Sequence, residues 1–339
     1  KLLAVPILYR SIGQCEWPNA IVAARTYLIM AARLNVALTG ASGFVGSYIL
    51  ARLLTGGHKV RVLIRQPAHF SPKIADAKLH VVPGSLFDDR ALSQLVQGVD
   101  AVIHIVGIIR QIPGAGQTFE RIHVESTQRL IRAAKQAGIK RWVHMSALGS
   151  RPDAVSSYHA TKWQAETYVR ESGLDFTIFR PSIIHGPDGE FMQMVKGFWC
   201  NLIPPFVPYF SAGPFGTGGA GRLQPIWVQD VARCFVESLA NINTMGETYP
   251  MGGPSTYRWP QLYQVCARHL PKARQKKILA VPVWKANLIA RLPGAPFNRD
   301  QVIMSQEDSV CDIGKVQSDF GFKLAAFDST FSQYATQIQ

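Results

Sequence analysis

The sequence lacks the features that mark several common classes of protein. Its five cysteines are scattered and never spaced as Cys-x-x-Cys, so neither a disulfide framework nor a zinc site is indicated. No run of eighteen or more apolar residues occurs, which argues against a membrane-spanning helix. With 47% hydrophobic and 17% charged residues, and no internal repeat, the composition is that of an ordinary globular protein. We expect an ordered, metal-free protein of a reducing, cytoplasmic compartment.

Acidic residues are missing from one long segment. Between Thr248 and Arg299 there is no Asp or Glu, whereas nine Lys or Arg residues occur there, and the formal net charge of the chain is +14. Such a segment attracts phosphates, an anionic membrane surface or an acidic protein complex. A basic face that merely contacts water is the alternative. Because the basic residues lack interleaved aromatics at a known motif spacing, no nucleic-acid partner is expected.

Short apolar runs alternate with helical patterns over the first two thirds of the chain. This alternation predicts an α/β fold with a doubly wound parallel sheet, followed by a small, mostly helical C-terminal lobe. Segment 202–221 is rich in Pro, Gly and aromatics and is predicted to be irregular. The strands are predicted at 36–39, 60–64, 80–82, 101–106, 142–145 and 176–179, and the helices at 44–54, 90–96, 120–137, 157–171, 228–239, 260–269 and 283–290.

We divide the chain into three parts. Residues 1–34 form an N-terminal extension, 35–200 a nucleotide-binding domain, and 201–339 a substrate or docking lobe into which the last sheet elements are interleaved. Residues 1–29 match no element of the fold. Either Met30 is the true start, or the segment is a targeting peptide.

Three glycines follow the first predicted strand. Gly40, Gly43 and Gly46 form G-x-x-G-x-x-G within "TGASGFVG", directly before a predicted helix. Glycines permit a tight turn and close approach of backbone to a pyrophosphate, and the helix N-terminus supplies free N–H groups. In this strand–turn–helix context the motif predicts a Rossmann-type dinucleotide site; a structural glycine turn without ligand is the alternative.

The end of the second predicted strand indicates which dinucleotide is bound. An acidic residue there would hold a ribose 2′-hydroxyl, and a basic one a 2′-phosphate. No Asp or Glu occurs between Ser47 and Ala75, and Arg65 lies where the acid would be. A guanidinium binds phosphate bidentately, so NADP(H) is favoured over NAD(H). A surface arginine without a ligand is the alternative.

Tyr158 and Lys162 stand as Y-x-x-x-K on a predicted helix, so both side chains share one face. An ammonium beside a phenol is expected to lower the pKa of the phenol toward neutrality. The phenol would then serve as acid or base for a carbonyl or alcohol during hydride transfer.

The chain here resembles the extended and atypical short-chain dehydrogenase/reductases, because "TGASGFVG", "YHATK" and "RPSIIHGP" follow one another in that family's order. The resemblance covers about residues 35–239. Family members add a Ser near the end of the fifth strand, where this chain has Ala147, with Ser146 one residue early. On a regular strand that shift would turn the hydroxyl to the other face. The family's adenine-side Asp is replaced by Ser85.

The resemblance implies a set of site residues. The catalytic group would be Tyr158 and Lys162, with Ser146 as an ambiguous third member. Together with Tyr158 and Lys162, the cofactor-binding positions would be Gly40, Ser42, Gly43, Phe44, Val45, Gly46, Arg65, Leu86, Val106, Gly107 and Pro181.

A further resemblance extends over nearly everything after residue 34. "TFERIHVESTQRLIRAAKQAGIKRWVHMSALGS", "LQPIWVQDVAR" and "NRDQVIMSQED" are similar to the nucleotide-binding accessory subunit of respiratory complex I (alpha subcomplex subunit 9) and its bacterial relatives. This implies a tightly held NADPH with little turnover and a lobe near a membrane surface, on the mitochondrial matrix side in a eukaryote. Trp284, Leu288 and Leu292 in the basic segment are each predicted to pack in the core.

Two functions follow. The first is an NAD(P)-dependent oxidoreductase or epimerase acting on a carbonyl, hydroxyl or quinone through Tyr158 and Lys162. The second is a non-catalytic accessory protein in which the nucleotide stabilises the fold. His104, His144 and His185 are predicted to be hydrogen-bonded interior residues rather than catalysts.

Overall fold

The computed structural model describes residues 33–292, 295 and 297–338, so the expectations for residues 1–29 lie outside the described residues. The described part contains a seven-stranded sheet in the order β11-β6-β5-β4-β1-β2-β3, with every pair of neighbours parallel. This confirms the predicted doubly wound α/β fold. The strands are β1 (Asn35–Thr39), β2 (Lys59–Ile64), β3 (Leu79–Pro83), β4 (Ala101–His104), β5 (Arg141–Met145), β6 (Asp175–Pro181) and β11 (Glu247–Met251).

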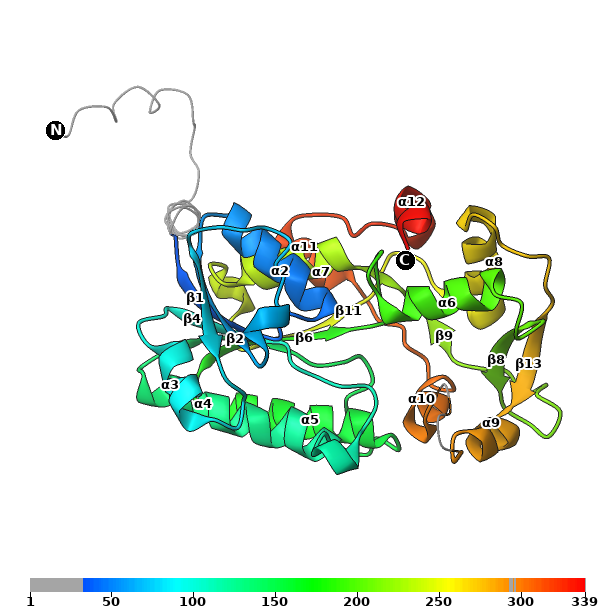
Figure 1. Cartoon of the computed structure of the whole chain (residues 1–339), viewed down its shortest axis with the longest axis horizontal. Coiled ribbons are helices and arrows are strands. Elements are labelled where there is room, and N and C mark those ends of the chain that lie inside the picture. The colour runs from blue at the N-terminus through cyan, green and yellow to red at the C-terminus, as the bar shows by residue number, and fades with distance from the viewer. Residues whose placement is uncertain (1–32, 293–294, 296, 339) are drawn as a thin grey trace, which may run out of the picture.

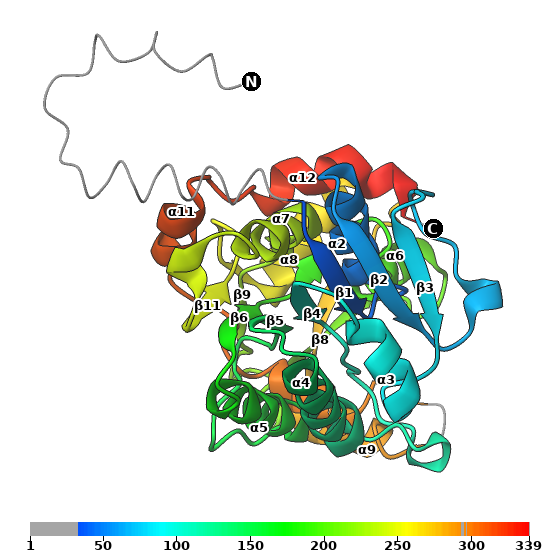
Figure 2. The same ribbon diagram turned by 90° about the vertical axis from the view of Figure 1, so that its left-hand side faces the viewer.

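Helices cover both faces of the sheet (Figure 2). On one face, α2 (Phe44–Thr55), α7 (Val228–Ser238) and α11 (Gly314–Phe320) bury apolar side chains against the strands. The other face is covered by α3 (Asp89–Val96), α4 (Ser126–Gln136) and α5 (Ser157–Glu171). The helix predicted at 120–137 starts as a π-helical segment, η3 (Glu120–Glu125), before α4. Burial on both faces explains why the central strands read as continuous apolar runs.

The C-terminal lobe has its own apolar core, to which α6 (Glu190–Cys200), α8 (Trp259–His269) and α12 (Phe327–Tyr334) contribute. Beside it lie α9 (Val283–Ile289) and α10 (Arg299–Met304), at the lower right of Figure 1. The smaller elements are β7 (Ile184–His185), β9 (Arg222–Leu223), β10 (Ile226–Trp227), β12 (Tyr257–Arg258), η1 (Pro67–His69), η2 (Pro113–Ala115), η4 (Ile242–Thr244) and η5 (Ala335–Gln337).

Two expectations about the lobe were wrong. The segment predicted to be irregular contains β8 (Val207–Ser211), which pairs in parallel with β13 (Ile278–Pro282), a partner about seventy positions away. Trp284, Leu288 and Leu292, predicted to lie in the core, are 55%, 59% and 59% exposed. Trp284 and Leu288 belong to α9, which buries Ala286 instead and so turns these large apolar side chains outward, and Leu292 follows the helix. Within the described ranges, no helix is both long and apolar enough to span a membrane.

Candidate functional site

In the glycine loop between β1 and α2, backbone atoms approach one another so closely that a side chain would not fit at Gly46. Gly40 has φ +86°, and the Gly43 N–H donates to the Gly40 carbonyl oxygen at 3.0 Å. A Cβ on Gly46 would lie 2.0 Å from that same oxygen. Gly43 is the N-cap of α2 and has no side chain that could occupy the first amides of the helix. These amides therefore remain available to a phosphate, as the motif predicts.

Arg65 and Ser85 lie near the same edge of the sheet. The register pairs Thr39 with Leu63, so the ends of β1 and β2 are adjacent, and the exposed Arg65 directly follows β2. Ser85, which stands in place of the family's Asp, accepts a hydrogen bond from the Phe87 N–H at 3.2 Å. A guanidinium and a hydroxyl, with no carboxylate at either position, thus follow the carboxyl ends of β2 and β3.

The remaining predicted cofactor positions fall into two groups. Ser42 is exposed and Phe44 and Val45 are partly buried at the start of α2, beside the loop. Leu86, Val106, Gly107 and Pro181 come after β3, at the end of β4 and at the end of β6. Leu86 is 8% exposed and packs in the core on the α3 side of the sheet. All of them lie toward the carboxyl ends of parallel strands, where open α/β sheets bind ligands.

The end of β4 connects the glycine loop to Lys162. A Cβ on Gly40 would lie 3.0 Å from the Ile105 side chain and 3.4 Å from the Val106 nitrogen. Two residues after Ile105, a Cβ on Gly107 would lie 2.9 Å from Lys162 Nζ. The two motifs, separated by more than a hundred residues in sequence, therefore meet at one strand end.

Tyr158 and Lys162 share the inner face of α5. The Tyr158 ring makes edge contacts with Phe119 and His123, at centroid distances of 5.8 and 5.4 Å. The Lys162 ammonium donates to the Met145 carbonyl oxygen at 3.1 Å. Burial lowers the pKa of Lys162 to about 8. Burial also raises the pKa of Tyr158 to about 12, so the expected lowering of this pKa was wrong: desolvation of the phenolate outweighs any attraction to Lys162.

Ser146 and Ala147 complete the end of β5. Both are buried, at 3% and 8% exposure. Within the described chain, the side-chain partner of the Ser146 hydroxyl is the hydroxyl of Ser150, at 3.1 Å. Ala147 presents only a methyl group. Position 147, where the resemblance leads us to expect a serine, therefore offers no hydroxyl, and the hydroxyl of Ser146 contacts that of Ser150.

His123 is a site residue that sequence reasoning missed. Its Nδ1 lies 2.9 Å from Thr161 Oγ1, and its Nε2 lies 3.2 Å from both the N and the O of Ile108. Desolvation, with Lys162 next, lowers its pKa well below 6.5, so the ring is neutral at pH 7. No motif marks this histidine, because its contacts come from a loop and a helix distant in sequence.

The three strand histidines differ from one another. His104 is hydrogen-bonded as predicted, to Thr39 Oγ1 at 2.6 Å and to Thr127 Oγ1 at 3.1 Å. His185 pairs with the Tyr334 hydroxyl at 3.0 Å through one nitrogen only. His144 is buried, but neither ring nitrogen has a hydrogen-bond partner in the described structure, so the prediction was wrong for this residue. Burial lowers the pKa of all three, which keeps them neutral.

Residues 298–309, which we call the strap, tie the lobe to the start of α5. Asp300 Oδ1 accepts from the Ser157 N–H at 2.8 Å and from the Ser156 hydroxyl at 3.2 Å. Since the Ser156 side chain makes no cap bond of its own, a carboxylate from the lobe caps the helix that carries Tyr158. Glu307 pairs with Arg151 at 2.8 Å and lies 3.2 Å from His159 Nδ1.

Buried charges further along α5 have a structural role. Glu166 is fully buried, and its two oxygens accept from Arg180 at 2.8 and 2.6 Å and from Arg170. Both guanidinium groups also lie over the ring of Trp163. Both oxygens of this carboxylate already accept hydrogen bonds from arginines. Glu166 therefore fixes α5 against β6 rather than acting as a base.

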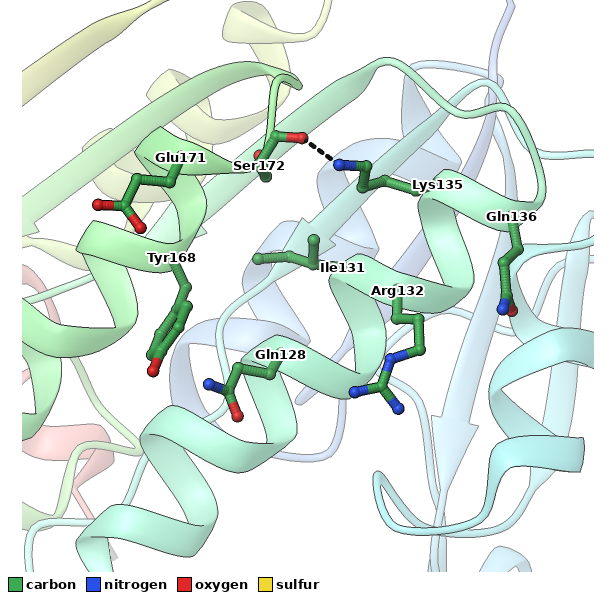
Figure 3. A pocket seen from close by; sticks show the side chains of 8 residues that line it. All are labelled: Gln128, Ile131, Arg132, Lys135, Gln136, Tyr168, Glu171 and Ser172. Atoms are coloured by element: carbon green, nitrogen blue, oxygen red, sulfur yellow. Dashed lines mark hydrogen bonds between the residues drawn. The ribbon is translucent and has the colours of Figure 1, made fainter.

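Two polar residues of "LQPIWVQDVAR" hold the lobe in place. Gln224 donates to the Gly253 carbonyl oxygen and accepts from the Cys311 N–H, both at 2.7 Å. Asp230 accepts from the Ala325 N–H at 2.7 Å. Figure 3 shows a hollow elsewhere, on the outer surfaces of α4 and α5, lined by Gln128, Ile131, Arg132, Lys135, Gln136, Tyr168, Glu171 and Ser172. None of the predicted site residues lines it.

Comparison with known proteins supports the prediction of nucleotide binding. The NAD(P)H-binding family matches residues 40–196. Ceramide reductase of Caulobacter vibrioides is 36% identical over 203 residues, 59% of this chain and 59% of that protein. The mitochondrial NADH-ubiquinone oxidoreductase 40 kDa subunit of Neurospora crassa is 25% identical over 294 residues, 81% of this chain and 73% of that protein. The structure of MoeE5 in complex with UDP-glucose and NAD has a TM-score of 0.69 at 20% identity, covering 89% of this chain and 98% of that one.

The chain is similar in sequence and in fold to the extended short-chain dehydrogenase/reductases. It is an NAD(P)-binding protein related both to reductases and to complex I subunits. The likeness to MoeE5 shows the shared fold alone. The match to ceramide reductase spans less than two thirds of that protein's length.

Proposed function

We propose that this protein is a short-chain dehydrogenase/reductase, an NADP(H)-dependent oxidoreductase that acts on a carbonyl or hydroxyl group. The observation that carries the proposal is the meeting of the glycine loop, Gly107 and Lys162 at the end of β4. A dinucleotide held by the loop would extend along this strand end toward the Tyr158 helix. When bound, the nucleotide supplies or accepts the hydride.

Tyr158 and Lys162 have different roles in this proposal. With its pKa raised to about 12, the Tyr158 phenol is protonated at neutral pH and suited to donate a proton to a carbonyl oxygen. The Lys162 ammonium, protonated below a pKa of about 8, offers hydrogen bonds to nucleotide hydroxyl or phosphate oxygens beside Gly107. Its positive charge also favours the phenolate that proton donation leaves behind. Neutral His123 packs against the phenol and holds the ring in place.

NADP(H) is proposed over NAD(H) because of Arg65. Replacing Arg65 by Ala removes a charge-assisted contact to a 2′-phosphate, which is expected to weaken NADPH binding roughly 10- to 100-fold. NADH binding should change little. Lys59→Ala, at the other end of the same strand, is the control. Fluorescence titration checks this, and equal affinity for both nucleotides in the unchanged protein would refute the preference.

The substrate is proposed to be an amphiphilic carbonyl compound or a quinone. The name of ceramide reductase denotes a lipid substrate, and that of the Neurospora crassa subunit denotes ubiquinone. Both are molecules of the bilayer. We further propose that the protein docks through its basic segment, residues 248–299, on an anionic membrane surface or a protein complex.

A second candidate function is favoured by Ala147. Without the usual serine, the nucleotide would serve as a structural ligand in an accessory protein of a larger complex. Binding would then stabilise the fold without hydride transfer. The two functions share one nucleotide site and differ in whether a substrate reacts there.

One experiment separates these two functions. The purified protein is analysed for a co-purifying dinucleotide, and NADPH oxidation is followed with aldehydes, sterol-like ketones, long-chain keto-amides and quinones. Tyr158→Phe should abolish turnover while NADPH binding stays intact. Tyr168→Phe, on the outer face of the same helix, is the matched control. Bound NADPH without turnover on any acceptor would favour the structural role.

A further inference from the structure

The outer face of α9 is apolar and uncovered in the described chain. Trp284 and Leu288, one helical turn apart, lie on one side of the helix, Leu292 follows three residues after its end, and all three are more than half exposed. The Trp284 indole N–H donates to the Pro214 carbonyl oxygen at 3.0 Å, which brings Phe215, 84% exposed, next to the helix. Exposed apolar side chains grouped in this way mark an interaction site, whereas single ones need no explanation.

The two segments that build this apolar group carry charges of one sign only, and the neighbouring strap adds Asp300, Glu307 and Asp308, which pair with Ser157, Arg151 and Arg222. No Asp or Glu occurs in residues 191–229 or 248–299, the two segments that build β8, β13, α9 and their loops. Lys285 and Arg291 are exposed on α9 and just after it. Two other basic residues are already engaged, since Lys276 and Arg274 donate to backbone carbonyl oxygens of the 198–204 segment. The charge of Lys285 and Arg291 thus has no nearby carboxylate from these elements.

We propose that this surface, the docking patch, inserts into the headgroup region of an anionic lipid bilayer. The docking patch comprises Phe215, Trp284, Lys285, Leu288, Arg291 and Leu292. A short helix lying flat, with Trp and Leu on one side and flanking Lys and Arg, is the pattern of interfacial membrane binding. Each basic residue at an anionic surface adds to the attraction. Six side chains also fall well short of the roughly 20–30 residues per partner that a stable protein–protein interface uses.

The docking patch is linked to the start of helix α5, which carries Tyr158, through α10. Helix α9 packs against α10, and Asp300 of α10 caps α5 one residue before Tyr158. In Figure 1 the two short helices lie side by side near the end of α5. Exposed Ile109 and Val155 come from the loops at this same end, and Ile109 accepts a hydrogen bond from Asn298 of the strap. This inference rests on the proposed function. Docking would place Tyr158 beside the bilayer, so the substrate class is a carbonyl lipid taken directly from the membrane.

Vesicle binding tests the docking patch without requiring turnover. The full chain with bound NADPH is mixed with vesicles and sedimented. One set of vesicles is phosphatidylcholine alone, and the other contains about 30% of the anionic lipid phosphatidylglycerol. We expect binding to the anionic vesicles only, weakened by salt. Trp284→Ser combined with Leu288→Ser should weaken it on the order of 100-fold. Lys285→Gln combined with Arg291→Gln should weaken it about fivefold per charge.

Controls use the same substitutions elsewhere on the surface. Ile74→Ser with Met245→Ser removes two exposed apolar side chains far from α9, and Lys59→Gln with Lys140→Gln removes two exposed charges. Both should leave vesicle binding unchanged, and every variant should retain NADPH binding. Absence of binding to anionic vesicles, or equal loss in patch and control variants, overturns the proposal. A dimer that dissociates in the Trp284 variant, seen by analytical ultracentrifugation, also overturns it.

A second measurement separates this inference from the proposed function. The Trp284→Ser, Leu288→Ser variant should reduce a ketone embedded in vesicles at least about tenfold more slowly, yet reduce a water-soluble short-chain ketone at the normal rate. If vesicles bind but no ketone reacts, the oxidoreductase proposal fails while the docking patch stands. If both ketones react equally in the variant and the unchanged protein, access from the membrane is refuted.

Discussion

Gly46 is a residue of the glycine loop at which a single added methyl group should have a large effect. In Gly46→Ala the new Cβ would stand 2.0 Å from the Gly40 carbonyl oxygen, so the loop must open. We expect a loss of about 1–3 kcal/mol in the free energy of unfolding and at least a roughly tenfold weaker affinity for NADPH. Gly197→Ala is the control, because its Cβ would meet its nearest atom at an ordinary 3.5 Å. Calorimetric titration of both variants checks this; unchanged NADPH affinity in Gly46→Ala would contradict it.

Lys162 should lower the free energy of unfolding, although the proposed reaction needs its ammonium group. Burial lowers its pKa from 10.5 to about 8. Between these values the unfolded chain binds more protons than the folded one, so the free energy of unfolding rises with pH over that window. Below about pH 8 the cost of burying the ammonium is fully present. Lys162→Met should therefore stabilise the protein by about 1–3 kcal/mol at pH 7 while it abolishes turnover.

Denaturant unfolding at pH 7 and pH 10 measures this effect. The gain from Lys162→Met should shrink toward pH 10. Lys135→Met is the control, since Lys135 also donates to a backbone carbonyl oxygen, that of Ser172, but from the protein surface. Its replacement should change the free energy of unfolding by less than about 0.5 kcal/mol. Destabilisation by Lys162→Met at pH 7 would show that the bond to Met145 outweighs the cost of burial.

At the scale of elements, helix α5 depends on a cap from another part of the chain. Asp300→Ala removes the carboxylate that accepts from the Ser157 N–H, which should cost about 1 kcal/mol. Amide hydrogen exchange should accelerate in the first turn of α5 and not in its last turn. Asp153→Ala, an exposed aspartate of the preceding loop, is the control and should leave exchange unchanged. Uniform acceleration along α5 would mean that Asp300 acts on the whole helix rather than on its end.

The elements that sequence could predict are those with an uninterrupted local pattern. The six predicted strands are apolar runs bounded by turns, and the glycine and Y-x-x-x-K spacings identify residues that do lie at one strand end. Strand β11 was missed because Pro250 interrupts a short edge strand, and β8 because its run also contains Pro208.

The rest of the site comes from contacts between distant parts of the chain. Asp300 meets Ser157 across 143 positions, and Glu307 meets Arg151 across 156. No local pattern encodes such a pair. The exposure of Trp284 is likewise decided by where α9 packs, because its periodicity is the same whether its apolar face turns inward or outward.

At the scale of the whole molecule, the strap should make the sheet and the lobe unfold together. Its residues bond to both parts, through Asp300 and Glu307 on one side and through Asp308, which holds Arg222 at 2.6 Å, on the other. We expect one calorimetric transition. NADPH at about 100 times its Kd should raise the free energy of unfolding by about 2.7 kcal/mol and move this one transition to a higher temperature. Two transitions, of which only one responds to NADPH, would contradict the coupling.

The position of Asp300 also has a consequence for biosynthesis. During synthesis the chain emerges from its N-terminus. When about the first 280 residues have left the ribosome, the glycine loop, Tyr158 and Lys162 are already outside it. Asp300, which caps helix α5, and Glu307, which pairs with Arg151, are then still inside the exit tunnel or untranslated. The nascent protein can therefore take up nucleotide before the neighbourhood of Tyr158 is finished, and translation of the strap becomes the step that completes it.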